Sequence, residues 1–446
     1  MTAVRVDPVD RLLRPIDRFM QAQTSGGILL VAAAVVAMVW ANSPWRDAYH
    51  DLWHHVISLR LDDHALDRTI HHWINDGLMA MFFFVVGLEL KREIVGGELS
   101  RPTAAILPVA AGLGGMVVPG LLYASLNAGG GEAAGGWGIP MATDIAFAVG
   151  VLSLLGKRVP VALKVFLTTL AIADDLGAVL VIAFFYSSDV SLVNLAIGML
   201  FLAILMGGNW LGVRSPLFYG LFGIGGVWLA FLMSGVHATV AGVLAAMTIP
   251  ASVKVDEQGF VRRMREHMDE FARLDPNQVQ TLTEAQLHTI DRAIRLAHHA
   301  TTPVQLLEHR LGPFVVYVVM PLFALANAGV ELPADVGGAL LSPVALGVLL
   351  GLLVGKPVGI LFVCWLTVRL GLARVGEAFG WRHLVGAAFL GGIGFTMSLF
   401  VGELALESES LRNQAKLAIL VASLLAGAIG FAVLRRATAP ADESTP

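Results

Sequence analysis

The stretch LAIADDLGAVLVIAFF, residues 170–185, places two adjacent carboxylates, Asp174 and Asp175, inside an otherwise apolar segment. Charged side chains in the middle of a bilayer are costly, so they are rare there and usually serve a function. Neighbouring residues on a helix point about 100° apart, so these two acids cannot both face one point. We therefore expect divided roles, with one acid paired to a base and the other facing an ion.

The composition predicts an all-α polytopic membrane protein. Of the 446 residues, 56% are hydrophobic and 14% are charged, whereas soluble domains carry about 25% charged residues. Forty-eight glycines and nineteen prolines suit close packing and breaks of membrane helices. Cys364 is the only cysteine, which excludes an intramolecular disulfide. The net charge of -4 says little about partners; we expect membrane lipid and no nucleic acid.

Apolar runs predict about twelve spans, since a span needs about 20 apolar residues. They begin near Gly26, Asn75, Thr103, Trp137, Pro160, Leu192, Pro216, Val236, Pro313, Pro343, His383 and Gln414. Loops that contain Lys and Arg alternate along the chain with loops that lack them, and basic residues should collect on the cytoplasmic side. The alternation favours an even number of spans with both termini in the cytoplasm. The first outer loop fits this pattern least well, because it contains three arginines together with five aspartates.

The predicted organisation has five parts. They are a cytoplasmic tail at 1–24, spans one to eight at 25–250, a charged cytoplasmic loop at 251–312, spans nine to twelve at 313–436, and a tail at 437–446. The first 20 residues hold four arginines and three aspartates, which indicates a tail and not a cleavable signal peptide. In the outer loop at 43–69, the alternating segment VISLRL, Val56 to Leu61, suits a short strand and hence a hairpin.

The loop at 251–312 holds nine acids, eight bases and five histidines. Its segment QLHTIDRAIRLAHH gathers apolar residues roughly on one helical face, so we expect a surface helix over the cytoplasmic face. Two interpretations stay open for this loop, a solvated connector and a regulatory element.

Few ionisable residues lie deep in the predicted spans, namely Asp144, Asp174, Asp175 and Lys356. Three acids and one base leave a negative excess, whereas a structural network would tend to balance. A carboxylate without a partner holds a proton more readily in a low-dielectric medium than in water. It can release that proton and accept a small hard cation through its oxygens. A buried structural ion pair remains the alternative, above all for Lys356.

Two predicted spans are poor continuous helices, and there is one in each half of the chain. GIPMATDIAFAVG, 138–150, contains Pro140 and the polar pair Thr143–Asp144; LGGIGFTMSLF, 390–400, contains three glycines. Paired interrupted segments mark the mid-membrane binding site of many transporters. Asp144 would then neutralise facing helix N-termini, and Lys356 facing C-termini.

Other charged residues lie near the predicted span ends. In GLELKREI, 87–94, Glu89 and Glu93 are either a snorkelling anchor or an acidic pair that senses pH or attracts cations at a funnel mouth. His237, near the outer surface, is either structural or pH-responsive. Glu308 and His309 precede the ninth span on the inner side, a position that suits a pH response.

Several motifs resemble the NhaA-type sodium/proton antiporters of bacterial inner membranes. They run in order from about residue 24 to 430 and are highly specific. They are SGGILL, WINDGLMAMFFFVVGLELKRE, PMATDIAFAVGVL, TLAIADDLGA, SGVHATVAGV, PLFALANAGV, GKPVGI and GIGFTMSLF. Paired broken helices are themselves a known feature of this family. The broken spans and the motifs are therefore not two independent indications.

The resemblance implies inverted repeats, spans three to five and ten to twelve, with spans four and eleven crossing as broken helices. It implies that Asp175 and Asp174 carry Na⁺ or Li⁺ and protons, that Asp144 and Thr143 support the site, and that Lys356 pairs with Asp174. The implied activity is electrogenic antiport that exports sodium, is activated at alkaline pH, and needs no cofactor.

The same resemblance implies a pH response and a dimer. The positions linked to the pH response are Glu89, Glu93, His237, Glu308 and His309. A homodimer would form partly through the hairpin in the outer loop. Two features depart from the family: the connection at 251–312 is longer than usual, and Gly312 stands where another histidine is frequent.

Three other functions fit the sequence less well. A sodium-coupled symporter of an organic anion would need a wider polar cavity, whereas the core motifs here are small and aliphatic. A proton-channelling subunit of a respiratory complex would need charges strung along several spans, but here they cluster at one depth. An enzyme would need a nucleophile or metal set, and no CxxC, HExxH or GxSxG pattern is present. We therefore expect a secondary active transporter, not an enzyme.

Overall fold

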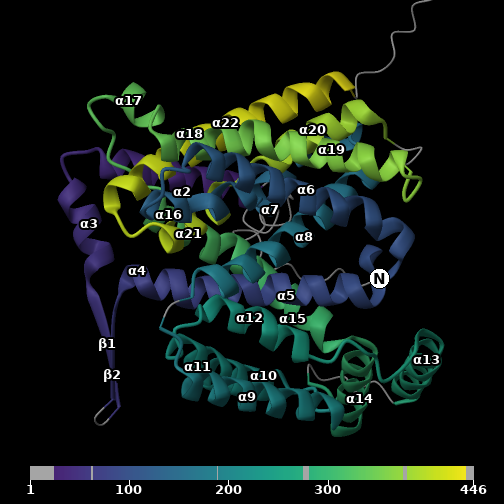
Figure 1. The fold of residues 1–446 in the computed structure, drawn as a ribbon. Coiled ribbons are helices and arrows are strands. Elements are labelled where there is room, and N and C mark those ends of the chain that lie inside the picture. Colours follow the sequence, from purple (N-terminus) through teal and green to yellow (C-terminus); the bar gives the residue numbers. More distant parts are fainter. Residues whose placement is uncertain (1–24, 62–63, 188, 275–280, 375–378, 438–446) are drawn as a thin grey trace, which may run out of the picture.

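Long helices run side by side through most of the molecule in the computed structural model (Figure 1). The structure describes residues 25–61, 64–187, 189–274, 281–374 and 379–437, so the predicted N-terminal tail and nearly all of the C-terminal one lie outside the described residues. Within these ranges, seven helical segments are long and apolar enough to cross a membrane. They are α6 (Pro102–Leu126), η3 with α7 (Glu132–Met141, Ile145–Leu154), α8 (Val161–Phe185), α9 (Leu192–Trp210), α15 with η6 and α16 (Pro303–Phe314, Val315–Val319, Met320–Asn327), α18 with η7 and α19 (Pro343–Leu350, Gly351–Gly355, Lys356–Arg369), and α22 (Glu409–Ala437).

The other predicted spans are bent, short or charged. The pairs α2 and α3 (Ser25–Ala41, Arg46–His54) and α20 and α21 (Trp381–Gly391, Phe395–Ala405) bend by 114° and 43°, and give nine spans if each pair counts as one. Three further segments are α10 with η5 and α11 (Pro216–Phe222, Gly223–Trp228, Leu229–Leu232), α12 (Ala238–Thr248), and α4 with η1 and α5 (Ile70–His72, Trp73–Leu78, Met79–Gly96). The polytopic helical fold is confirmed, and the count of twelve spans stays a prediction.

Helices α6 and α19, the predicted spans three and ten, cross in close contact. A Cβ atom added to Gly114 would lie 2.4 Å from the carbonyl oxygen of Gly359, and one added to Gly359 would lie 2.1 Å from that of Gly114. Only glycine allows the two backbones to approach this closely, as small residues do at membrane helix contacts. The contact joins the two halves of the chain.

One end of the bundle carries an antiparallel hairpin, and we call it the hairpin end. Strand β1 (Val56–Leu61) pairs with β2 (His64–Thr69), with Val56 opposite Thr69, so the strand that the alternating sequence predicts is present. The hairpin projects beside the bundle (Figure 1). Nearby, α3 is fixed to the bundle because the Tyr49 hydroxyl donates to the carbonyl of Leu325 at 2.8 Å.

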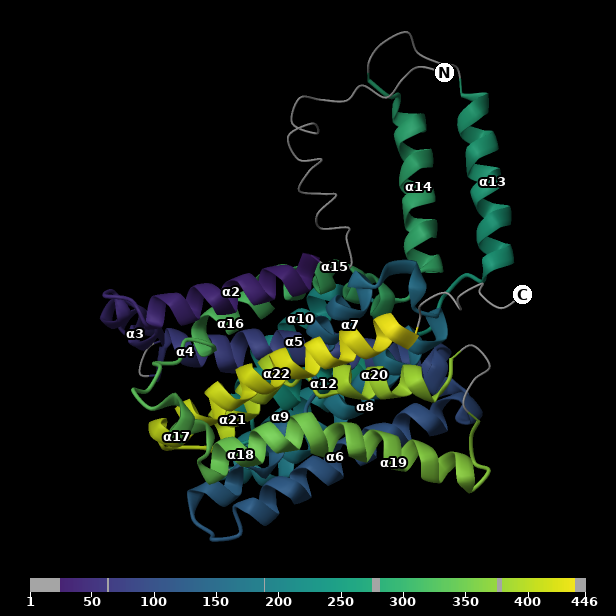
Figure 2. The same ribbon diagram turned by 90° about the horizontal axis from the view of Figure 1, so that it is seen from above.

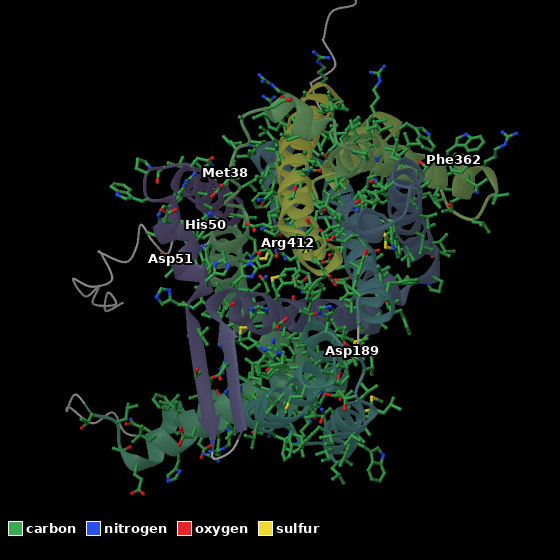
Figure 3. All side chains as sticks on the ribbon, turned by 60° about the vertical axis from the view of Figure 1, so that its left-hand side comes forward. Met38, His50, Asp51, Asp189, Phe362 and Arg412 are labelled. Carbon is green, nitrogen blue, oxygen red and sulfur yellow. The ribbon has the colours of Figure 1, made fainter. Side chains whose placement is uncertain are left out.

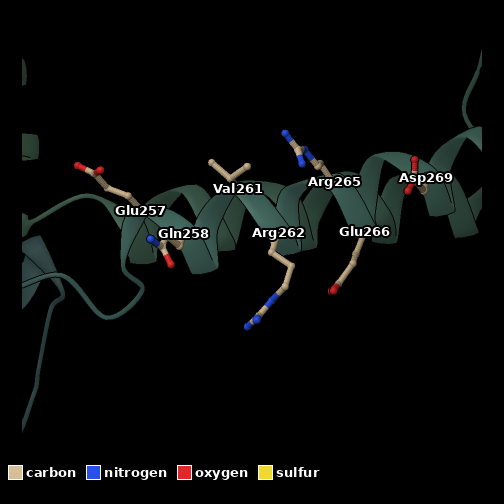
Figure 4. Close-up of a pocket in the computed structure, with 7 residues that line it drawn as sticks. All are labelled: Glu257, Gln258, Val261, Arg262, Arg265, Glu266 and Asp269. Carbon is tan, nitrogen blue, oxygen red and sulfur yellow. The ribbon is translucent and has the colours of Figure 1, made fainter.

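The opposite end, which we call the charged end, carries two helices where the sequence predicted one. Helices α13 (Glu257–Arg273) and α14 (Glu284–Ala300) pack against each other and stand away from the bundle (Figure 2). Each has its own N-cap, Asp256 and Thr283, and residues of this type are the sequence signal for two separate helix starts. Figure 4 shows the largely charged side chains of α13 pointing away from its axis. The following helix, α15, begins at Pro303, ahead of the predicted start at Pro313.

The two helices of this insert are linked by an exposed ion pair, with Arg292 Nη2 lying 2.5 Å from Glu270 Oε1. The remaining short helices lie in connections, and they are η2 (Glu98–Ser100), η4 (Gly156–Arg158) and α17 (Val336–Leu340).

Candidate functional site

The two interrupted spans meet at their breaks. The chain between η3 and α7 is non-helical at 142–144, and the chain between α20 and α21 is non-helical at 392–394. The backbone N–H of Asp144 donates to the carbonyl of Ile393 at 2.7 Å. Residues that are far apart in the sequence are therefore held together in the interior of the bundle.

Asp144 lies where two helices begin. Its Oδ1 accepts the N–H of Phe147 at 2.9 Å and so caps α7. Its Oδ2 accepts the N–H of Thr396 at 3.1 Å and also the Thr396 hydroxyl, in the first turn of α21. The positive ends of two helices thus face one fully buried carboxylate, which stabilises its charge.

Lys356 lies where η3 ends. Its Nζ is 2.8 Å from Asp174 Oδ2, with both side chains fully buried, and it donates to the carbonyl of Met141, the last residue of η3. The Thr143 hydroxyl lies 2.7 Å from Asp174 Oδ2 and 2.8 Å from the carbonyl of Gly391, the last residue of α20. The acidic pair on α8 is therefore tied to both breaks through Asp174.

Asp175 differs from its neighbour. Its side chain is fully buried, and neither of its oxygens accepts a hydrogen bond within the described part of the chain. Asp174 Oδ1 is unpaired in the same sense. Buried carboxylate oxygens are normally satisfied, so these three oxygens are available to a proton or to a small hard cation. No group of three or more His, Cys, Asp or Glu side chains among the described residues is arranged to hold a resident metal ion.

A cavity of about 320 Å³ leads to this region from the charged end. Its wall is formed mainly by α2, α5, α7 and η6, and it includes Glu89, Arg92 and Gly312 at one end and Asp144 at the other. Most of its other lining side chains are apolar. It gives ions a path to the break in η3–α7 from one side of the bundle.

The residues that the sequence linked to a pH response divide into two groups. Arg92 lies 3.0 Å from Glu93 and also contacts Glu308, and Glu89 lines the same cavity; His309 is exposed beside Glu308. His237 lies apart from them, in the connection before α12, with Nε2 2.9 Å from the carbonyl of Tyr186.

Sequence reasoning missed Thr396. It stands two residues after Gly394 in the quoted motif, directly behind the glycine-rich break, and that position was the available signal. The carbonyl groups of Met141 and Gly391 could not be found from side-chain chemistry at all.

Comparisons with known proteins agree over nearly the whole chain. The family described as Na⁺/H⁺ antiporter 1 matches residues 17–434. The Na(+)/H(+) antiporter NhaA of Oleidesulfovibrio alaskensis is 48% identical over 429 residues, which cover 96% of this chain and 95% of the relative. That of Acidithiobacillus ferrooxidans is 49% identical over 428 residues, 94% of this chain and 97% of the relative. That of Koribacter versatilis is 45% identical over 439 residues, 98% and 95% of the two chains.

Proposed function

This chain belongs to the Na⁺/H⁺ antiporter 1 family, and from that premise we propose that Asp175 and Asp174 carry the exchanged ions. The protein is a multi-pass membrane transporter that exchanges sodium for protons. The observation that supports the placement of its site is the buried carboxylate of Asp175, which has no hydrogen-bond partner in the described chain. An acid that is left unpaired in a protein interior is a functional candidate.

The exchange follows from competition at these oxygens. Sodium enters through the cavity at the charged end and displaces protons from Asp175 and Asp174. The loaded site then opens toward the hairpin end, sodium leaves, and protons bind from that side. Because a carboxylate holds either a proton or a sodium ion, the two fluxes are coupled without covalent chemistry.

The supporting residues hold the two breaks in place during this exchange. Asp144 compensates the two helix N-termini. Lys356 compensates the C-terminal carbonyl of η3 and the charge of Asp174, and Thr143 links Asp174 to α20. Binding of Na⁺ or Li⁺ at Asp175 would leave these contacts intact. The transport is electrogenic, with more protons entering than sodium ions leaving, and it is driven by the proton gradient as secondary active transport.

The wider setting belongs to the same proposal. The charged end faces the cytoplasm of a bacterium, both termini lie there, and the protein works in the inner membrane. Glu89, Glu93 and Glu308 surround Arg92 at the cavity mouth and respond to internal pH, with His309 beside them and His237 on the other side. Two copies associate through the hairpin, where Val56 and Ile57 are exposed.

Proton movement in inverted membrane vesicles tests the site. Respiration acidifies the interior, and NaCl is then added over a range of neutral to alkaline pH. We expect sodium-dependent alkalinisation with the parent protein and none with Asp175→Ala. Asp335→Asn is the control, because Asp335 is an exposed N-cap of a connecting helix.

Retained exchange in Asp175→Ala would contradict the assignment of the site. Absence of a response in the parent at every pH would instead direct attention to sodium-driven uptake of an organic anion.

A further inference from the structure

One face of α21 leads from the proposed ion site toward the hairpin end. Thr396, Phe400 and Glu403 are spaced by four and three residues, so they lie on the same side of the helix. Thr396 contacts Asp144. Glu403 lies about 10 Å farther along the axis, since each helical residue rises about 1.5 Å.

The first layer along this face is aromatic. Phe400 is fully buried, and its ring centroid lies 5.7 Å from that of Phe83 on α5 and 6.2 Å from that of Phe323 on α16. Phe83 and Phe323 are fully buried as well. Three rings from three helices therefore close the space between the ion site and the hairpin end.

The second layer is polar and lies farther out. Glu403, whose side chain is 7% exposed, is 2.5 Å from Lys416 and 3.8 Å from Arg412, and Arg412 lies near the start of α22 (Figure 3). Across from it, His71 Nε2 lies 4.0 Å from Glu403 Oε2 and 3.0 Å from Asn327 Oδ1. Asn327 in turn donates to Asn75 at 3.0 Å.

This polar layer is at the opposite end from the open cavity. His71 and Glu89 belong to one helical run over 70–96 and are separated by about 27 Å, at about 1.5 Å per residue. Glu89 lines the cavity from the charged end. The cavity therefore approaches the break at Asp144 from the side of Glu89, whereas the aromatic and polar layers cover the side of His71.

The contacts of Glu403 are unequal. Its shortest ion pair, 2.5 Å to Lys416, and a longer one of 3.8 Å to Arg412 both involve α22, which packs beside α21. Among the described residues, its one ion-pair contact with the helix run at 70–96 is the 4.0 Å contact with His71. Glu403 is therefore neutralised on its own side and is joined to the opposite helices by a weak link that can open without leaving a bare charge.

We propose that Glu403 and His71 form an outer latch, which with the Phe83–Phe323–Phe400 layer closes the exit toward the hairpin end. The proposal rests on the antiport function above, because it describes how the same site is kept closed on one side. When the site turns outward, α21 and α22 move as a unit away from α4 and α16. The His71–Glu403 contact breaks first, and the three rings then separate.

The test measures access to the inner cavity and requires no ion transport. A single cysteine is placed at Val149, which lines that cavity, as Val149→Cys with Cys364→Ala. Inverted vesicles are treated with a membrane-impermeant maleimide, and the labelling rate is measured. Glu403→Gln weakens the latch and shifts the population toward the outward state, so we expect labelling to slow by about two- to fivefold.

Variants on both sides of the contact identify the latch. His71→Gln should slow labelling by a similar factor, and the double variant should add little, because both changes break one contact. Glu407→Gln, an exposed acid just after α21, is the matched control and should label at the parent rate. Glu403→Asp keeps the charge and tests the distance if Glu403→Gln folds poorly.

Equal labelling rates in the parent, Glu403→Gln and His71→Gln would overturn the latch, and so would fully additive effects in the double variant. Failure of the antiport assignment would show itself differently. Sodium-dependent proton movement would then be missing from the parent, whatever the labelling rates.

Discussion

At the scale of single residues, the proposed ion site depends on the different surroundings of two neighbouring acids. Asp174 is paired with Lys356 and accepts the hydroxyl of Thr143. Asp175 has no hydrogen-bond partner within the described chain. Sequence reasoning predicted this division from the angle between adjacent helical residues. It could not predict which acid would take which partner, because that depends on how α8 is rotated against α19; the family resemblance supplied the assignment.

Removal of Lys356 should destabilise the protein strongly. Lys356→Met leaves Asp174 buried without its counter-charge, and breaking a buried pair on one side costs about 3–5 kcal/mol. Lys356→Met with Asp174→Leu should recover much of this loss, because no lone charge remains. Thermal unfolding of the purified protein in detergent measures both variants. A double variant as unstable as Lys356→Met alone would contradict this explanation.

His237 should make stability depend on pH. Burial lowers the pKa of His237, and the charge of Asp76 offsets part of that effect. The unfolded chain binds a proton at about pH 6.5 while the folded one resists it. This contribution is therefore complete above that pH and is lost as the pH falls below it. The melting temperature of His237→Gln should fall less between neutral and acidic pH than that of the parent; equal slopes would contradict the prediction.

At the scale of elements, the decisive contact is the crossing of α6 and α19. It depends on two glycines whose backbones touch, Gly114 and Gly359. The sequence contains 48 glycines, and nothing in their spacing marks these two, because the contact is between residues far apart in the chain. The broken spans were easier to predict, since Pro140 and the glycines before Thr396 disrupt a helix locally.

Gly114→Val should abolish correct assembly. Its side chain would collide with the backbone and with Val363 of α19, and overpacking of this kind typically costs at least about 1–3 kcal/mol. Gly207→Val in α9 is the control, because a Cβ there meets no atom within 4 Å. The yield of monodisperse protein in size-exclusion chromatography gives the result. Normal yield of Gly114→Val would show that the crossing can loosen.

The insert of α13 and α14 should be dispensable for exchange. Its ion pair, Arg292 with Glu270, lies within the insert, and the pair of helices stands away from the bundle (Figure 2). Replacing residues 257–298 with a short Gly-Ser linker should leave the maximal rate of sodium-dependent proton movement unchanged within about twofold. An unchanged pH profile would support the connector interpretation, and a shifted one the regulatory interpretation.

At the scale of the whole molecule, the loop charges predicted how the chain is threaded. The basic loops and the insert were assigned to one side, and the hairpin and the loops without Lys or Arg to the other. Apolar length alone predicted the helices well. It could not predict the contact of His71 with Glu403, because an acid at the end of a span, such as Glu403, looks like an ordinary loop residue in sequence.

Cysteine labelling should confirm the orientation. Gln258→Cys on α13 should react with an impermeant maleimide in inverted vesicles and not in intact cells, whereas Glu407→Cys should behave in the opposite way. Both positions are exposed, and the native Cys364 is buried, so it provides little background. Labelling of both positions from one side would contradict the proposed threading.

The two helix N-termini that meet at Asp144 have a further consequence. They form a concentrated positive field in the middle of the protein, and one carboxylate offsets it. Helix N-termini without such an acid bind anions. Replacement of Asp144 by serine would thus leave a pocket that suits chloride. One side chain therefore decides whether this break accommodates a cation or an anion.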